Sequence, residues 1–288
     1  MHNEYAREEV RSLDVVMCTW NSNKSWFKKC LESIKREIPF HHIVIVDRFS
    51  VDGTLDVVKE VFPSAVIAQS AEHLARARAL GITLVDTDWF LFIDSDVEIP
   101  KGWFKNILSN LGEGIAVVHG YALAVSRSSR KWNEFIYSFS RVPKLIDVDS
   151  SNPDRVRGLL DATLLLRSAV EDWNPPSYLP GFEDHHMLRH VVNKGYEWRM
   201  LPRLYVNHHV GFIPRLKRAR WDSACARLIK FPNHNLKTLL KRTLVGLPLA
   251  IFGALKMGEP MIIPNILFNR LFSLIGYVGW TKYTLLRR

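Results

Sequence analysis

The stretch Trp89-Phe90-Leu91-Phe92-Ile93-Asp94-Ser95-Asp96-Val97-Glu98 passes directly from five apolar residues to three carboxylates at alternate positions. An unbroken apolar run of this kind predicts a strand that is buried on both faces of a sheet. Carboxylates at the end of such a strand lose hydration as they are buried, and a divalent cation can offset that cost. Carboxylate oxygens suit Mg²⁺ or Mn²⁺. The alternative is a polar turn whose Asp side chains cap a helix around Lys101–Asn110.

Upstream of this stretch, short apolar strands alternate with helical segments. The predicted strands are Leu13–Thr19, His42–Asp47, Ala65–Ala68 and Trp89–Ile93, and the helices between them are Ser25–Glu37, one from Thr54 that ends before Pro63, and Glu72–Leu84. This alternation indicates parallel βαβ units in an open α/β sheet, whose ligands gather at the carboxyl ends of the strands. Those ends are Thr19, Asp47 and Asp94, which predicts one crevice lined by three strand ends.

Downstream of Gly112 the pattern changes. Two further strands, Ile115–Val125 and Ala162–Arg167, flank a segment from Arg127 to Arg157 that is rich in Arg, Ser and aromatic residues. So long an excursion predicts a functional loop or short helices. The predicted core domain is completed by a helix over Glu183–Asn193, a strand within Tyr196–Val206 and the pair His208-His209.

The composition is that of a globular protein. The chain has 288 residues, 47% apolar and 24% charged, which allows one large domain or a domain with an appendage. Its cysteines, Cys18, Cys30 and Cys225, lack metal-ligand spacing and are too few for a disulfide framework, so a reducing, cytosolic location is expected for the main domain. Residues 1–9 are polar, so no signal peptide is expected there.

The net charge of +10 is concentrated in the last part of the chain. Residues 210–288 hold 14 Lys and Arg against Asp222 and Glu259, a net +12, which leaves −2 for the first 209 residues. A nearly neutral body with a basic, apolar tail indicates an anionic phosphate or a membrane surface as partner. Because the tail has long aliphatic runs rather than a dense basic helix, a membrane is expected and nucleic acid is not.

Six short motifs, in order, resemble those of the inverting glycosyltransferases of family 2, which have the GT-A fold. They are Val16-Met17-Cys18-Thr19-Trp20-Asn21, Ile45-Val46-Asp47 with Asp52-Gly53-Thr54, Ala77-Arg78-Ala79-Leu80-Gly81, Asp94-Ser95-Asp96, Gly181-Phe182-Glu183-Asp184 and His208-His209. The resemblance covers Leu13 to Trp221. It implies a mixed, mostly parallel central sheet, and the chain is similar in some details to dolichyl-phosphate mannose synthases and cellulose synthases.

The resemblance implies a metal ion that binds the diphosphate of a nucleotide sugar. Such an ion acts as a Lewis acid on the leaving group, where negative charge develops. Asp96 would ligate Mn²⁺ or Mg²⁺, and Asp94 would lie beside the ribose or the metal. Glu98 would be a third carboxylate ligand or else a solvated surface acid. His208 or His209 would lie near the diphosphate and metal, although a histidine is often structural.

Donor binding is implied for the first three motifs. Thr19, Trp20 and Asn21 belong to the first of these, and Asp47 would accept hydrogen bonds from the nucleobase. Asp47 is followed by Arg48, where family members often have a second acid, so the identity of the base stays open. Arg78 would bind the diphosphate through paired, charge-assisted hydrogen bonds or lie on a solvated helix face.

Inversion requires a base that removes the proton of the acceptor. Asp184 matches the base of the family, with Glu183 as a second candidate near the acceptor and diphosphate. The alternative is that both acids merely complement the dipole of the helix that they begin. A phosphate acceptor would need no strong base, and Asp184 would then position groups.

The basic segment Arg215-Leu216-Lys217-Arg218-Ala219-Arg220-Trp221 resembles the Q-x-x-R-W motif of processive relatives, with Lys217 in place of Gln. By this resemblance Arg220 would contact the diphosphate and Trp221 the acceptor sugar. The alternative is a face that lies against anionic lipid headgroups.

Two apolar segments follow, Thr243–Leu255 and Met261–Trp280. The first is short for a bilayer span of roughly 20 residues. The second carries a stripe of polar residues every four positions, which would face protein, headgroups or a lipid-phosphate substrate. The stripe is Asn265, Asn269 and Ser273, and the flanking charges are Lys241, Arg242, Lys282, Arg287 and Arg288. A membrane-spanning hairpin and interfacial helices are both compatible with this pattern.

Together these features predict a membrane-associated, metal-dependent, inverting glycosyltransferase whose catalytic domain faces the cytoplasm. It would transfer a sugar from GDP-mannose or a UDP-sugar to a lipid-linked acceptor, with polyprenyl or dolichyl phosphate favoured. The expected parts are a GT-A domain over 1–210, a basic connecting segment over 211–234 and a helical membrane region over 235–288. The alternatives are a nucleotidyltransferase or a catalytically silent membrane scaffold.

Overall fold

The computed structural model describes residues 10, 12–177, 179, 181–232 and 234–279. Its contacts divide the chain into two compact units. The first unit contains the described residues up to Ala122, those of 143–179 and Glu183–His209. The second contains Leu123–Val142, Gly181 and Phe182, and the described residues from Val210 onward. The division after His209 falls next to the predicted domain boundary, but Leu123–Val142 groups with the second unit.

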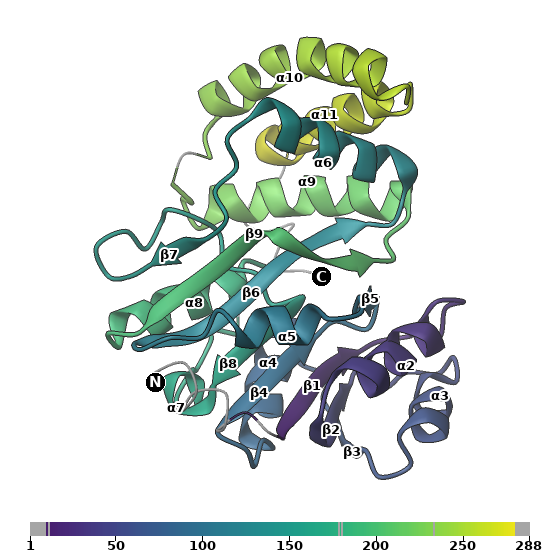
Figure 1. The fold of residues 1–288 in the computed structure, drawn as a ribbon, viewed down its shortest axis with the longest axis vertical. Coiled ribbons are helices and arrows are strands. Elements are labelled where there is room, and N and C mark those ends of the chain that lie inside the picture. Colours follow the sequence, from purple (N-terminus) through teal and green to yellow (C-terminus); the bar gives the residue numbers. More distant parts are fainter. Residues whose placement is uncertain (1–9, 11, 178, 180, 233, 280–288) are drawn as a thin grey trace. The chain divides into compact units, whose positions relative to one another are not determined.

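A mixed sheet forms the first unit, as the resemblance implies (Figure 1). Its hydrogen-bonded strand order is β3-β2-β1-β4-β8-β6-β9-β5, with β7 beside β9. The strands are β1 Leu13–Thr19, β2 Phe40–Asp47, β3 Val66–Gln69, β4 Trp89–Ile93, β5 Val97–Glu98, β6 Ile115–Ala124, β7 Ile146–Val148, β8 Ala162–Leu166 and β9 Glu197–His208. Strands β3, β2, β1 and β4 are parallel. The expectation that the sheet is mostly parallel is wrong, because β8 pairs antiparallel with β4 and β6, and β9 pairs antiparallel with β5 and β7.

Strand β4 lies at the centre of this sheet, and all five of its residues are buried. It pairs with β1 on one side and β8 on the other, which explains why its sequence lacks polar alternation. The capping interpretation of the acids that follow it is wrong. The next helix, α5, begins at Trp103 after Gly102 and has no side-chain cap.

The helices of the first unit are α2 Phe27–Glu37, α3 Thr54–Val61, α4 Leu74–Thr83, α5 Trp103–Leu108, α7 Arg167–Val170 and α8 Glu183–Asn193. Gly81 lets α4 lie unusually close to the sheet, because a Cβ atom there would be 2.4 Å from Cγ1 of Val16 in β1. This approach brings Arg78, one turn earlier, under the carboxyl ends of the central strands.

The second unit contains four long helices, labelled in Figure 1 as α6 Arg127–Phe139, α9 Phe212–Leu228, α10 Leu236–Met257 and α11 Ile262–Gly279. Helix α11 packs against α9 and α10, and α6 packs against α10 and α11. The segment from Arg127 to Arg157 thus contains one long helix and strand β7. The predicted connecting segment is largely helix α9. The predicted flanking charges Lys282, Arg287 and Arg288 lie outside the described residues.

Helix α10 is longer than the apolar run Thr243–Leu255 that predicts it. It begins after Asn235, whose side chain accepts a hydrogen bond from the backbone N–H of Thr238 at 2.9 Å, and it ends at Gly258 with a left-handed φ of 60°. The helix therefore includes Lys237, Lys241 and Arg242 in its first turns.

Candidate active site

The ends of β1 and β2 are joined by a network around Asp47. Its buried carboxylate accepts hydrogen bonds from the Thr19 hydroxyl at 2.7 Å, the Ser50 hydroxyl at 2.6 Å and the Ser50 N–H at 2.8 Å. These bonds hold the loop after β2 against the end of β1. A role of Asp47 toward a nucleobase stays a prediction, and its visible role is to shape the loop.

The loop after β1 continues this network outward. Asn21, with a left-handed φ of 47°, donates its N–H to the Ser50 hydroxyl and accepts from the N–H of Val51. Trp20 is exposed, and the guanidinium of Arg48 lies 4.8 Å from the centre of its ring. Of the three predicted donor residues of this motif, Thr19 and Asn21 organise the two loops, and Trp20 presents an aromatic face to solvent.

Arg78 connects the end of β4 with the start of α8. Its guanidinium donates to the carboxylate of Asp94 and to that of Glu183, each at 2.7 Å. Arg78 is buried, so the interpretation of a solvated helix face is wrong. Burial alone would lower the pKa of Arg78, but the two carboxylates more than compensate and raise it. Two acids that are 89 positions apart in sequence thus share one cation.

Replacing Arg78 by alanine is expected to destabilise the protein by about 3–5 kcal/mol, because it leaves carboxylates near the core without their shared cation. The measurement is the free energy of unfolding in urea. Arg76→Ala on the same helix is the matched control, since Arg76 is only half-buried and contacts no carboxylate in its hydrogen bonds to Asn174 and Pro175, and less than about 1 kcal/mol is expected there. Equal stabilities of the two variants would contradict a central role for the Arg78 bridge.

Two of the five predicted metal ligands, Asp96 and His208, meet because β5 pairs with the end of β9. The Asp94 carboxylate is bound by Arg78 instead. Nε2 of His208 lies 3.0 Å from Oδ2 of Asp96, and the N–H of His209 donates to the backbone oxygen of Asp96 at 2.8 Å. Antiparallel pairing therefore brings together residues that are 112 positions apart.

Glu98 pairs with the second histidine. Its carboxylate lies 2.8 Å from Nε2 of His209 and 3.1 Å from the ammonium of Lys29, while the ring of Trp26 stacks on His209. The Glu98 side chain is 14% exposed, so it is not a solvated surface acid. Burial alone would raise the pKa of Glu98, but hydrogen bonds from His209 and Lys29 lower it below its usual range.

Asp184 lies in the first turn of α8 and is buried. Its carboxylate accepts from Nε of Arg157 at 2.9 and 3.1 Å and from the N–H of His185 at 2.7 Å. Burial and the neighbouring Glu183 carboxylate together raise the pKa of Asp184 to about 7, against the opposing effect of Arg157. A carboxyl group that titrates near neutrality can act as a general base.

Three residues of this site escaped prediction from the sequence: Trp26, Lys29 and Arg157. No motif marks them, and each contacts a predicted residue that is more than 25 positions away. Trp26 and Lys29 lie at the start of α2 and Arg157 lies before β8, and they contact the predicted residues only once the sheet has formed.

Arg220 and Trp221 lie on α9 in the second unit, and their predicted contacts with diphosphate and acceptor stay predictions. Trp221 packs on the cluster formed by Phe182, Ala224 and Cys225. The backbone of Arg220 is crossed closely by Gly276 of α11, where a Cβ atom would be 2.0 Å from the Arg220 carbonyl oxygen.

A separate group of possible metal ligands lies at the opposite ends of β1 and β2. Within the described residues, Asp14, His41 and His42 form a group whose ligand atoms lie within 4.8 Å of one another. The buried Asp14 carboxylate accepts from the N–H groups of His42, Asp86 and Thr87 at 3.0, 2.7 and 3.3 Å. This carboxylate thus anchors backbone, away from the acids that follow β4.

Asp96 and His208 offer two donor groups of the kind that a divalent cation such as Mn²⁺ binds. Carboxylate and imidazole groups are suitable donors for such ions, and the side chains of Asp96 and His208 already approach within 3.0 Å of each other. The exposed fraction of Asp96, 37%, leaves its carboxylate accessible to a ligand.

The fold resembles that of solved glycosyltransferases. A mannosyltransferase from Pyrobaculum calidifontis, solved with GDP-Man and Mn²⁺, aligns with a TM-score of 0.55 at 17% identity over 99% of this chain and 85% of its own. Glucosyl-3-phosphoglycerate synthase from Mycobacterium tuberculosis, solved with Mn²⁺ and UDP, aligns with a TM-score of 0.51 at 15% identity over 77% of this chain and 81% of its own. The fold is thus the GT-A fold.

The family follows from the sequence. The model of glycosyl transferase family 2 matches residues 14–172, more than half of the chain, so the chain belongs to glycosyl transferase family 2. The SPbeta prophage-derived glycosyltransferase SunS of Bacillus subtilis strain 168 is 30% identical over 94 residues, which are 32% of this chain. The aligned part spans 22% of the length of SunS.

Proposed function

We propose that the protein is a metal-dependent, inverting glycosyltransferase that uses a nucleotide sugar. The observation that carries this proposal is the Arg78 bridge between Asp94 and Glu183, which brings the acids at the end of β4 next to the start of α8, where Asp184 lies. The proposed donor-binding acids and the candidate base belong to one unit, which supports the proposal. Membership of family 2 supports the same reaction class.

Asp96 and His208 would hold the metal ion, with Asp94 facing the ribose or the metal. Bound Mn²⁺ or Mg²⁺ would supply Lewis-acid stabilisation of the diphosphate leaving group. The mannosyltransferase and the synthase named above were both solved with Mn²⁺, which supports this assignment. Glu98 and His209 form a second pair beside the first, and we assign them to orienting the loop that carries Asp96.

Asp184 would take the proton from an acceptor hydroxyl as its oxygen attacks the anomeric carbon, which inverts the configuration there. A phosphate acceptor already carries a nucleophilic oxygen, so Asp184 would then position the acceptor. In either case Arg157 must share Asp184 with the incoming group, because its Nε contacts both carboxylate oxygens.

The donor is proposed to be GDP-mannose or a UDP-sugar, and the acceptor a lipid-linked molecule such as a polyprenyl or dolichyl phosphate. The lipid acceptor is supported by α10 and α11, which are long and apolar enough to cross a membrane by length and composition. Only 22% of the most apolar 18-residue stretch of α10 and 17% of that of α11 is buried. The core helix of a soluble protein is instead mostly buried. The protein would associate with the membrane and have its catalytic unit on the cytoplasmic side.

A donor screen tests this function. Purified protein is incubated with Mn²⁺ or Mg²⁺ and a panel of GDP- and UDP-sugars, and both donor hydrolysis and transfer to a lipid extract are followed. We expect one nucleotide class to be consumed only when a divalent metal is present, and the product to have the opposite anomeric configuration to the donor. Retention of configuration, or no turnover of any donor with either metal, would refute the proposal.

A further inference from the structure

Helix α10 exposes most of its large apolar side chains, and apart from Leu239 the residues that it buries are small. The exposed stripe follows helical spacing through Leu236, Leu240, Leu244, Leu247, Ile251 and Leu255. Leu244 and Leu255 are 74% and 78% exposed. The buried face instead contains Gly246, Ala250, Gly253 and Ala254. A helix in water has the reverse arrangement, so the outer face of α10 is suited to an apolar medium.

Helix α11 repeats this arrangement. Its exposed residues Phe268, Leu271, Ile275 and Val278 recur at helical spacing, while Asn265 and Gly276 are buried. Because α10 and α11 pack on each other, the two stripes belong to one hairpin. The exposed apolar residues of this hairpin therefore form a continuous pattern along two helices, unlike the isolated apolar residues that are common on protein surfaces.

The inner side of the hairpin is covered by protein and combines an apolar cluster of Ala250, Ala254 and Ile262 with polar contacts of Asn265. The Asn265 side-chain amide donates to the hydroxyls of Ser128 and Ser129 at 3.1 and 3.4 Å, and its carbonyl oxygen accepts from Arg215. Gly276 gives α11 close contact with the backbone of α9. The first residue of the predicted polar stripe therefore meets protein and not lipid.

The exposed apolar face and the protein-covered face of the hairpin indicate whether it spans a bilayer or lies in the plane of its surface. Figure 1 shows α6 and α9 running alongside the hairpin, with which they pack. Both carry exposed charges, such as the Lys131–Glu134 pair on α6 and Arg218 on α9. A spanning hairpin would take these helices to membrane depth, where each of their charges would lose its hydration at a large cost. A hairpin in the membrane plane leaves them in water.

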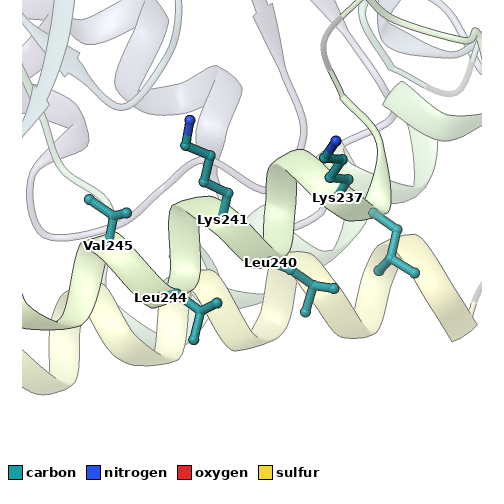
Figure 2. Close-up of a pocket in the computed structure, with 6 residues that line it drawn as sticks. Lys237, Leu240, Lys241, Leu244 and Val245 are labelled. Atoms are coloured by element: carbon teal, nitrogen blue, oxygen red, sulfur yellow. The ribbon is translucent and has the colours of Figure 1, made fainter.

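Basic residues at the start of α10 identify the kind of membrane. Figure 2 shows Lys237 and Lys241 extending to one side of the helix, while Leu240 and Leu244 extend to the other. The ammonium groups and Arg242 are exposed beside the apolar stripe. Lysines flanking an apolar helix face reach phosphate headgroups while the leucines enter the acyl region.

We infer that the α10–α11 hairpin is a monotopic anchor that lies in the plane of an anionic membrane, with the Leu236–Leu255 stripe in the acyl region and Lys237 and Lys241 at the headgroups. The inference deepens the proposed function, since it says how the transferase would reach a lipid-linked acceptor. It rests on that proposal for the acceptor but not for the geometry of the hairpin.

Depth measurements test the plane of the hairpin. Single cysteines replace Leu244, Ile251 or Leu255 in the full chain, carry an environment-sensitive fluorophore, and are quenched by lipids spin-labelled near the headgroup or near the chain end. The native thiols will not interfere, because Cys225 is buried and burial raises the pKa of Cys18 and Cys30 to about 12. We expect equal, shallow depths at all three positions. A spanning helix would separate positions 244 and 255 by about 16 Å in depth, and that result would overturn the inference.

Vesicle binding tests the lipid partner. The Lys237→Ala, Lys241→Ala double variant is expected to bind vesicles of phosphatidylglycerol and phosphatidylcholine about thirtyfold more weakly than the native protein. The matched control is Lys59→Ala with Lys105→Ala, two exposed lysines of the first unit, and its binding should be unchanged. An equal loss in both variants, or equal binding to pure phosphatidylcholine, would refute an anionic surface.

A second copy of the chain is the competing occupant of the stripe. Leu244→Glu with Leu255→Glu should abolish vesicle binding while the molecular mass in light scattering stays monomeric for both proteins. A dimer that these substitutions dissociate, with no vesicle binding, would replace the membrane by self-association. Donor hydrolysis in detergent is recorded for every variant, so a failure of the transferase proposal is seen separately from a failure of the anchor.

Discussion

Replacing Asp96 by alanine is expected to lower kcat/KM for the nucleotide sugar about thousandfold. The carboxylate lies three residues after the end of β4, is 3.0 Å from His208 and remains partly exposed, so it is well placed to hold a divalent ion. A metal that stabilises a leaving diphosphate contributes several kcal/mol to the transition state, which corresponds to about three orders of magnitude. Steady-state kinetics with Mn²⁺ measure the loss.

Mn²⁺ binding supplies a readout besides activity. Titration calorimetry or the free-Mn²⁺ resonance signal should show a site in the native protein that is lost in Asp96→Ala. Asp56→Asn, an exposed acid on α3, is the control and should retain both binding and turnover. Unchanged turnover in Asp96→Ala would remove this residue from the site.

Replacing Asp184 by asparagine is expected to lower transfer to a hydroxyl acceptor by about 10²–10⁴, because the amide cannot take up the proton. Transfer to a lipid phosphate should fall much less, since that nucleophile is already ionised. Comparing the two acceptors in one assay thus shows whether Asp184 acts as a base. An equal loss with both acceptors would instead assign it to positioning.

The pH dependence gives a further check on the same residue. The pKa of Asp184 is raised to about 7 and the base must be deprotonated, so kcat/KM for a hydroxyl acceptor should rise with pH and level off above about 7. Arg157 favours the ionised carboxylate, so Arg157→Ala should shift the rising part of this pH profile, its acid limb, to higher pH. Arg189→Ala, on the exposed side of α8, should leave the limb in place. A limb that does not move in Arg157→Ala would contradict the assignment.

Much of the fold is readable in the sequence because its signals are local. The five apolar residues Trp89–Ile93 predict a doubly covered strand, and β4 has those bounds, with neighbours on both sides. The bounds of β1 and α8 also agree with prediction. Strand alternation, helix caps and apolar runs depend on residues that are close in sequence, so they can be recognised without knowing which segments pack together. The acids that follow β4 are also recognisable locally, because they stand at alternate positions after an apolar run.

The tertiary structure decided what each of those acids touches. Arg78 could have been a solvated residue until α4 and α8 were placed, and Glu98 could have been a surface acid until β5 paired with β9. No motif marks Arg157, which ends the segment that the sequence predicts to be a functional loop or short helices. The polar stripe of α11 could have faced lipid or protein, and packing within the second unit placed Asn265 against Ser128 and Ser129. Burial, pKa and charge compensation arise from groups that are distant in sequence, so they exist only once the chain has folded.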